Sequence, residues 1–277
     1  MRLIGHRGAS HVAPENTLAA LHLALANGCG FEVDLQLLRD GTLVVLHDDT
    51  LERTAAPDAA LPMKAIVRTP IEQLRWAEVA DVDVGSWIDA ERFGAERVPR
   101  FADVLQALAG AGAGHAPREA PHCFAELKAA EPFDPALPSA AVRAVDAARV
   151  PPSSLTWISF SVPVLVEVKR LDARFSALYV ASPKTAEEAW RAARSCVRHE
   201  LDGIDLRARA DLVTPELVDW MHARHKRVAV WVGRAPAAED VPELWAAMEA
   251  AGVDDFTSNL PPAILAWKRA AAAEGNS

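Results

Sequence analysis

Cysteine is scarce in this chain. Three residues in 277 are cysteine, namely Cys29, Cys123 and Cys196, and none stands in a C-x-x-C spacing. An odd number of widely separated cysteines argues against a disulfide framework, so we expect buried, reduced thiols. The chain also lacks a G-x-S-x-G nucleophile elbow, and no cysteine follows the strands that carry its polar motifs. A serine or cysteine nucleophile is therefore not predicted.

Long hydrophobic runs are also missing. No stretch reaches the roughly 18 apolar residues that a membrane helix needs, so we expect no stable membrane insertion. Residues 1–30 do not have the pattern of a signal peptide, and a cytoplasmic location is expected. Basic residues are outnumbered, 29 Lys and Arg against 38 Asp and Glu, which gives a net charge of −9. This balance does not predict nucleic-acid binding, and an anionic substrate would need a metal ion or a few placed basic groups.

Strand-like and helix-like segments alternate along most of the chain. Nine segments have strand patterns: 3–6, 31–36, 43–47, 123–128, 155–160, 175–180, 203–206, 228–232 and 255–257. Helical patterns lie between most of them: 17–27, 99–109, 140–149, 162–170, 185–198, 214–225 and 241–251. This alternation predicts a parallel sheet closed into a (β/α)8 TIM barrel. Such a barrel has eight strands, so we interpret 203–206 as an extra or irregular strand.

The barrel is expected to form one domain over residues 1–277. Its rhythm is lost between about residues 49 and 97, after the third predicted strand, where prolines are scattered and a single short helical patch appears at 71–74. A segment of this length without clear periodicity is usually a functional insertion, so we predict a small insertion and no second domain.

Acidic residues stand at the ends of two predicted strands. Glu32 and Asp34 are two positions apart, so both side chains point to one face of the strand, and Glu126 and Lys128 repeat this spacing. Carboxylates this close repel each other unless a cation lies between them. Three of them at the C-terminal rim of a barrel would form a hard oxygen site suited to Mg²⁺ or Ca²⁺.

Two histidines and two basic residues accompany these carboxylates. His6 and His47 also follow predicted strands, and we assign them as the candidate acid and base. Metal ligation by either histidine stays open, although the carboxylates already supply a site. Arg7, with its bidentate fork, and Lys128, as a point charge, are candidate phosphate-binding residues.

Taken in order, these motifs resemble those of the glycerophosphodiester phosphodiesterase family. The pattern comprises His6-Arg7-Gly8, Glu15-Asn16-Thr17, Glu32-x-Asp34 with Gln36, Asp40-Gly41, His47-Asp48 with Arg53-Thr54, Gly85-Ser86-Trp87, Val98-Pro99, Glu126-x-Lys128, Ser159-Phe160, Trp231 and residues 254–261. Each motif alone is weak, but the ordered set is specific and covers nearly the whole chain.

The resemblance implies a TIM barrel that hydrolyses glycerophosphodiesters, with a divalent metal ion, to an alcohol and sn-glycerol 3-phosphate. It implies these roles: His6 and His47 as the acid–base pair; Glu32, Asp34 and Glu126 as metal ligands; and Arg7, Glu15, Lys128 and Trp231 as residues that contact the substrate or support the site. Without a protein nucleophile, either a water activated by the metal or the glycerol 2-hydroxyl of the substrate must attack phosphorus. The resemblance favours the hydroxyl, which would give a cyclic phosphate that water then opens.

The chain departs from the family pattern at three places. Leu38 stands where the family usually has Thr, Val232-Gly233-Arg234 where it has Thr and Asn after the tryptophan, and Ser258-Asn259 where it has Thr-Asp. The last two departures face the substrate and leave the preferred head group open. Arg234 would either add a positive contact for an acidic head group or be a solvated loop residue.

The sequence leaves two alternative functions open. One is a phospholipase D-like lyase that acts on lysophospholipids and releases a cyclic phosphate, on the same barrel. The other is a non-catalytic barrel that only binds a sugar phosphate. The identity of the divalent ion and the formation of a homodimer are also left open by the sequence.

Overall fold

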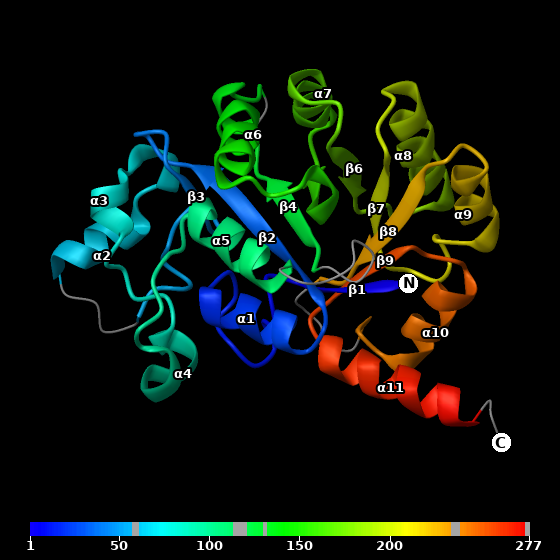
Figure 1. The fold of residues 1–277 in the computed structure, drawn as a ribbon, viewed down its shortest axis with the longest axis horizontal. Coiled ribbons are helices and arrows are strands. Elements are labelled where there is room, and N and C mark those ends of the chain that lie inside the picture. Colours follow the sequence, from blue (N-terminus) through cyan, green and yellow to red (C-terminus); the bar gives the residue numbers. More distant parts are fainter. Residues whose placement is uncertain (57–60, 113–120, 130–131, 234–238, 275–277) are drawn as a thin grey trace.

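A computed structural model describes residues 1–56, 61–112, 121–129, 132–233 and 239–274. Eight parallel strands form a closed barrel: β1 (Arg2–Gly5), β2 (Gly30–Leu37), β4 (Cys123–Leu127), β5 (Leu155–Ser159), β6 (Ser176–Ala181), β7 (Gly203–Arg207), β8 (Arg227–Trp231) and β9 (Asp255–Ser258). The ring closes because β1 pairs in parallel with both β9 and β2. The predicted (β/α)8 TIM barrel is thus confirmed (Figure 1).

Strand β7 corrects one prediction from the sequence. The segment at 203–206, interpreted as extra or irregular, is a regular barrel strand that pairs in parallel with β6 and β8. The strand outside the barrel is instead β3 (Leu43–Val45), which pairs antiparallel with β2. Its direction follows from the tight turn at Asp40-Gly41, because a hairpin turn reverses the chain and cannot join two parallel strands.

Helices surround the barrel and separate its strands along the chain (Figure 1). They are α1 (Leu18–Ala26), α5 (Phe101–Gly112), α6 (Ala136–Ala148), the 3-10 helix η2 (Pro152–Ser154), α7 (Val162–Leu171), α8 (Ala186–Arg198), α9 (Pro215–His222), α10 (Pro242–Ala250) and α11 (Pro261–Glu274). Threonine side chains cap three of them, because Thr17, Thr185 and Thr214 each accept a backbone N–H at the helix start. Among the described residues, no helix has both the length and the apolar character to cross a membrane.

Apolar residues fill the space on both sides of the strands. The larger core lies between the strands and the helices and includes Phe31, Phe101 and Trp157. A smaller cluster fills the barrel interior: Ile4, Phe124, Ile158, Leu178, Val180 and Ala229. Because successive side chains of a strand point to opposite faces, the polar residues that extend the interior rows come together at the barrel mouth.

The insertion consists of short elements beside the barrel (Figure 1). They are the helices α2 (Leu61–Arg68), η1 (Ile71–Gln73), α3 (Trp76–Val79) and α4 (Ser86–Phe93), which follow the antiparallel strand β3. The sequence had indicated only the patch at 71–74. These elements pack around a hydrophobic core of their own, to which Val44, Leu51 and Val79 belong. The chain that leaves β3 carries His47 back toward the barrel mouth.

Candidate active site

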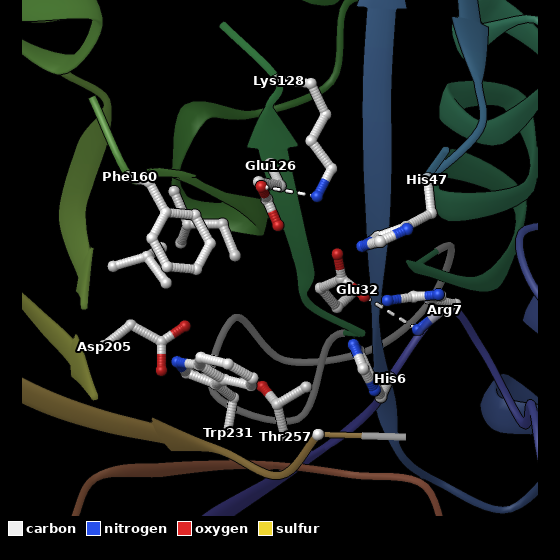
Figure 2. A pocket seen from close by; sticks show the side chains of 13 residues that line it. His6, Arg7, Glu32, His47, Glu126, Lys128, Phe160, Asp205, Trp231 and Thr257 are labelled. Atoms are coloured by element: carbon white, nitrogen blue, oxygen red, sulfur yellow. Dashed lines mark hydrogen bonds and ion pairs between the residues drawn. The ribbon is translucent and has the colours of Figure 1, made fainter. Parts of the chain in front are cut away.

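A cavity of about 240 Å³ opens at the C-terminal ends of the barrel strands (Figure 2). Seven residues assigned from the sequence line it: His6, Arg7, Glu32, His47, Glu126, Lys128 and Trp231. Six others were not assigned: Ile158, Phe160, Val180, Asp205, Gly233 and Thr257. Asp34 and Glu15, also assigned from the sequence, are buried behind the lining residues and contact them. The structure therefore brings every assigned residue to one place.

Glu32, Asp34 and Glu126 form a compact cluster. Each offers one carboxylate oxygen, and these oxygens lie within 4.8 Å of one another. The parallel register of β2 and β4 explains this geometry, because it sets Asp34 directly beside Glu126. All three side chains are buried. A cluster of buried carboxylate oxygens fits a hard divalent cation such as Mg²⁺ or Ca²⁺.

The charges of the cluster are poorly balanced without a cation. Burial and the neighbouring carboxylates raise the pKa of Glu32 well above its usual value, and they raise the pKa of Glu126 to about 7. Burial also opposes the ionisation of Asp34, but Lys128 and Arg7 outweigh it and lower the pKa of that group. Two of the three carboxyl groups thus favour the protonated form, which a bound divalent cation would reverse.

This imbalance predicts that metal ions stabilise the protein more at high than at low pH. Because the pKa of Glu126 is raised from 4.5 to about 7 on folding, its contribution to stability is present at low pH and is lost as the pH rises toward 7. A divalent cation binds the ionised form. The rise in Tm on adding Mg²⁺ or Ca²⁺ should therefore be larger at about pH 8 than at about pH 5.

Thermal unfolding with excess chelator or with excess ion, at both pH values, measures this difference. The matched control is Glu126→Gln, which removes the titrating group. In this variant the rise in Tm on adding metal should depend less on pH. An equal gain in Tm at both pH values would contradict the assignment of Glu126 as a ligand.

Arg7 and Lys128 border the carboxylate cluster. The backbone N–H of Arg7 donates to Glu32 Oε2 at 2.8 Å. Lys128 Nζ lies 3.0 Å from Asp34 Oδ1 and 2.8 Å from Glu126 Oε1. Both cations face the cavity, so they can contact an anionic ligand bound there.

A chain of ion pairs holds His47. Its Nδ1 lies 2.6 Å from Asp48 Oδ1, and because a carboxylate only accepts, we place the ring proton on Nδ1. Arg53 Nε donates to Asp48 Oδ2 at 2.6 Å, and its Nη2 donates to Glu15 Oε1 at 2.7 Å. Glu15 also accepts from Arg7 Nη1 at 2.7 Å. Glu15 thus links the two arginines. Asp48 and Arg53, which belong to the family-like motif but had no predicted role, position the histidine.

His6 is oriented by a residue from the end of the last strand. His6 Nδ1 lies 2.9 Å from Asn259 Oδ1, while Asn259 Nδ2 donates to the carbonyl of Gly233 at 3.0 Å. The second bond directs the amide oxygen of Asn259 toward the ring, so Nδ1 is the donor and Nε2 remains an acceptor. Burial, with Arg7 nearby, lowers the pKa of His6 to about 4. The ring is therefore neutral at physiological pH.

Two residues of the site, Asp205 in the cavity lining and Asn259 beside His6, were not predicted from the sequence. Asp205 comes from the strand that had been interpreted as irregular. Asn259 had appeared only as a departure from the family pattern, and its hydrogen bond depends on the closure of the barrel. Of the other departures, Leu38 belongs to the core of the insertion, and Arg234 lies outside the described residues.

The closed parallel barrel, with carboxylates, cations and two histidines at its C-terminal mouth, places this protein among TIM barrels that have a candidate divalent-metal site. Residues 6–261 match the model of the glycerophosphoryl diester phosphodiesterase family, over more than half of the chain. The chain belongs to this family.

Individual relatives match only part of the chain in sequence, whereas solved structures superpose on most of it. The glycerophosphodiester phosphodiesterase of Caldanaerobacter subterraneus is 35% identical over 107 residues, which are 38% of this chain and 40% of that protein. Human glycerophosphodiester phosphodiesterase 1 is 54% identical over 52 residues, 18% of this chain and 16% of that protein. The chain thus spans 40% of the length of the first curated relatives that it matches. A phosphodiesterase from Oleispira antarctica, solved with the product sn-glycerol-3-phosphate, superposes with a TM-score of 0.76 at 25% identity and covers 96% of each chain.

Proposed function

We propose that this protein hydrolyses glycerophosphodiesters to an alcohol and sn-glycerol 3-phosphate, with Mg²⁺ or Ca²⁺ as the cofactor. The observation that carries the proposal is the convergence, in one cavity of a family member, of the carboxylate cluster with Arg7, Lys128 and two histidines. The product complex of the Oleispira antarctica phosphodiesterase supports the choice of substrate.

Glu32, Asp34 and Glu126 are proposed to hold the divalent ion. When bound, the ion supplies positive charge against the negative charge of the phosphoryl oxygens. Arg7 and Lys128 then hold the phosphate from the sides, and Glu15 keeps Arg7 in place through their ion pair.

His6 and His47 are proposed to act as base and acid, respectively. His6 is neutral and keeps Nε2 as an acceptor, as a general base requires. Burial lowers the pKa of His47, but Asp34 and the hydrogen bond to Asp48 act in the opposite direction. The carboxylate of Asp48 therefore stabilises the imidazolium form that a general acid needs.

The nucleophile is proposed to be the glycerol 2-hydroxyl of the substrate. His6 takes the proton of this hydroxyl as its oxygen bonds to phosphorus, and His47 protonates the oxygen of the departing alcohol. A cyclic 1,2-phosphate forms, and water then opens it with the roles of the two histidines exchanged. Attack within one molecule gains from proximity, and among the described residues no serine or cysteine lines the cavity to replace it.

A substrate without the 2-hydroxyl should bind but hardly react. We expect a propane-1,3-diol analogue to have a KM near that of the parent diester and a kcat at least about 100-fold lower, because the internal nucleophile is missing. Steady-state kinetics on both compounds, at the same metal concentration, measure this difference. Turnover of the analogue within a few-fold of the parent would show that water attacks directly.

The activity itself is tested with a panel of choline, ethanolamine, glycerol, serine and inositol diesters, read as released glycerol 3-phosphate. Turnover that a chelator abolishes and added metal restores supports the proposal. Binding without turnover would favour the non-catalytic barrel. Accumulation of a cyclic phosphate from lysophospholipids would favour the lyase.

A further inference from the structure

The cavity has two chemically different halves. Glu32, Glu126, the two cations and the histidines line one half, whereas Phe160 and Trp231 lie in the other (Figure 2). Ile158 and Val180, which also line the cavity, belong to the apolar cluster against which Trp231 packs. The rings of Phe160 and Trp231 meet nearly at right angles, with an interplanar angle of 81° and centroids 6.1 Å apart. They form an aromatic corner at the side of the cavity away from the metal site.

A carboxyl group lies beside this corner. Asp205 reaches the cavity from β7, and only 1% of it is exposed to solvent. Its Oδ1 has no hydrogen-bond partner among the described residues. The indole Nε1 of Trp231, which also lacks a partner in the described part of the chain, points toward it (Figure 2).

No described side chain neutralises Asp205. The nearby cation, Arg227, forms an ion pair with Asp255 at the base of the barrel. Burial, with Asp255 and Glu126 adding negative charge, raises the pKa of Asp205 well above its usual value. A buried carboxyl group with no partner costs free energy, so a ligand that brings a positive charge would gain by pairing with it.

Aromatic faces together with a carboxylate are the groups that bind quaternary ammonium ions. An acidic head group would make the ionisation of Asp205 still less favourable and would gain no ion pair there. A polyol head group would place hydroxyls against Ile158, Val180 and Phe160, which offer no side-chain hydrogen-bonding atoms. Thr257 lies between Trp231 and His6, and its hydroxyl has no hydrogen-bond partner among the described residues (Figure 2).

We propose that Asp205, Phe160 and Trp231 form a subsite for a cationic alcohol head group, for which choline is the probe. This subsite rests on the proposed function, since it names the alcohol that leaves. It makes Asp205 a residue that determines specificity and leaves the bond-breaking steps to the other half of the cavity.

The test separates charge from shape with two matched substrates. Glycerophosphocholine carries the cation, and the 3,3-dimethylbutyl diester has the same shape with carbon in place of nitrogen. We expect wild-type kcat/KM to favour the choline diester roughly tenfold or more. Asp205→Asn should abolish this preference, mainly by raising KM for the choline diester, whereas kcat/KM for the uncharged diester should change much less.

Asp211→Asn is the matched control. It also removes one negative charge, but Asp211 is exposed, is paired with Arg209 and does not line this cavity, so the preference should persist. A second readout uses wild-type protein only: choline should protect it from thermal unfolding at lower concentration than 3,3-dimethylbutanol does. This readout tests whether the subsite binds a cation even if the Asp205→Asn variant does not fold.

Three results would overturn the subsite: equal kcat/KM for the two matched diesters, equal losses for both in Asp205→Asn, or inositol and glycerol diesters as the best substrates. The first two results would indicate that the cavity does not distinguish a charged from an uncharged head group. The third would indicate a polyol-binding site. Failure to release glycerol phosphate from any diester would instead overturn the proposed function. Protection of the wild-type protein by choline would still show whether the subsite binds a cation.

Discussion

Glu126→Gln is expected to lower kcat/KM for a glycerophosphodiester by roughly 1,000-fold, because it removes one oxygen ligand and the charge that attracts a divalent ion. The same substitution should not lower the Tm of the metal-free protein. Burial and Asp34 raise the pKa of Glu126 to about 7, so at neutral pH its ionised form already weakens the folded state. The neutral amide avoids that cost, although it gives up the ion pair with Lys128.

Two further variants complete this experiment. Glu32→Gln and Asp34→Asn should also lose orders of magnitude in turnover at limiting metal, and isothermal titration should show weaker binding of Mg²⁺ or Ca²⁺. Asp34→Asn should in addition lower stability, because it removes the partner of Arg7 and Lys128. Near wild-type turnover in all three variants at limiting metal would refute the metal site.

His6→Ala and His47→Ala should each lower kcat/KM by roughly 100-fold or more, the usual contribution of a general acid or base. The double variant should lose much less than the product of the two single losses, because both groups serve one proton-transfer event. Losses that simply multiply would indicate that the histidines act in separate steps.

The pH dependence distinguishes the two histidines. The base must be unprotonated, so activity falls as the pH drops through the pKa of His6, which is about 4. The acid must be protonated, so activity falls as the pH rises through the pKa of His47, and the profile of kcat/KM is bell-shaped. Asn259→Asp places a carboxylate against His6 Nδ1 and should move the acid limb to higher pH. A profile that this variant leaves unchanged would contradict His6 as the base.

The carboxylate cluster could be predicted in large part because it depends on local rules. The two-residue spacing of Glu32 and Asp34, repeated from Glu126 to Lys128, fixes which side chains share a face of a strand. Parallel pairing then brings strand ends to one rim. These rules place the carboxylates on one rim, whereas the direct pairing of β2 with β4, which sets Asp34 beside Glu126, appears only in the structure.

The incorrect strand assignments arose where pairing between segments far apart in the sequence determines whether a segment joins the barrel. Gly203 looks weak for a strand, yet a Cβ there would lie 2.4 Å from the Arg227 carbonyl oxygen, so the close approach of β8 favours glycine. Conversely, 43–47 has a good strand pattern, but the hairpin keeps it out of the parallel ring. The helices of the insertion, for example α3 with four residues, are too short to show a helical period.

The separate core of the insertion has a consequence for how the protein loses activity. His47 lies in the segment between β3 and this unit, whereas His6 and the proposed metal ligands belong to barrel strands or their ends. A unit with its own core can open at a lower free energy than the whole molecule unfolds. Such partial opening would displace His47, the proposed general acid, and leave the proposed cation site assembled. We therefore expect inactivation on heating to coincide with faster amide hydrogen exchange in 61–98, ahead of exchange in the barrel strands.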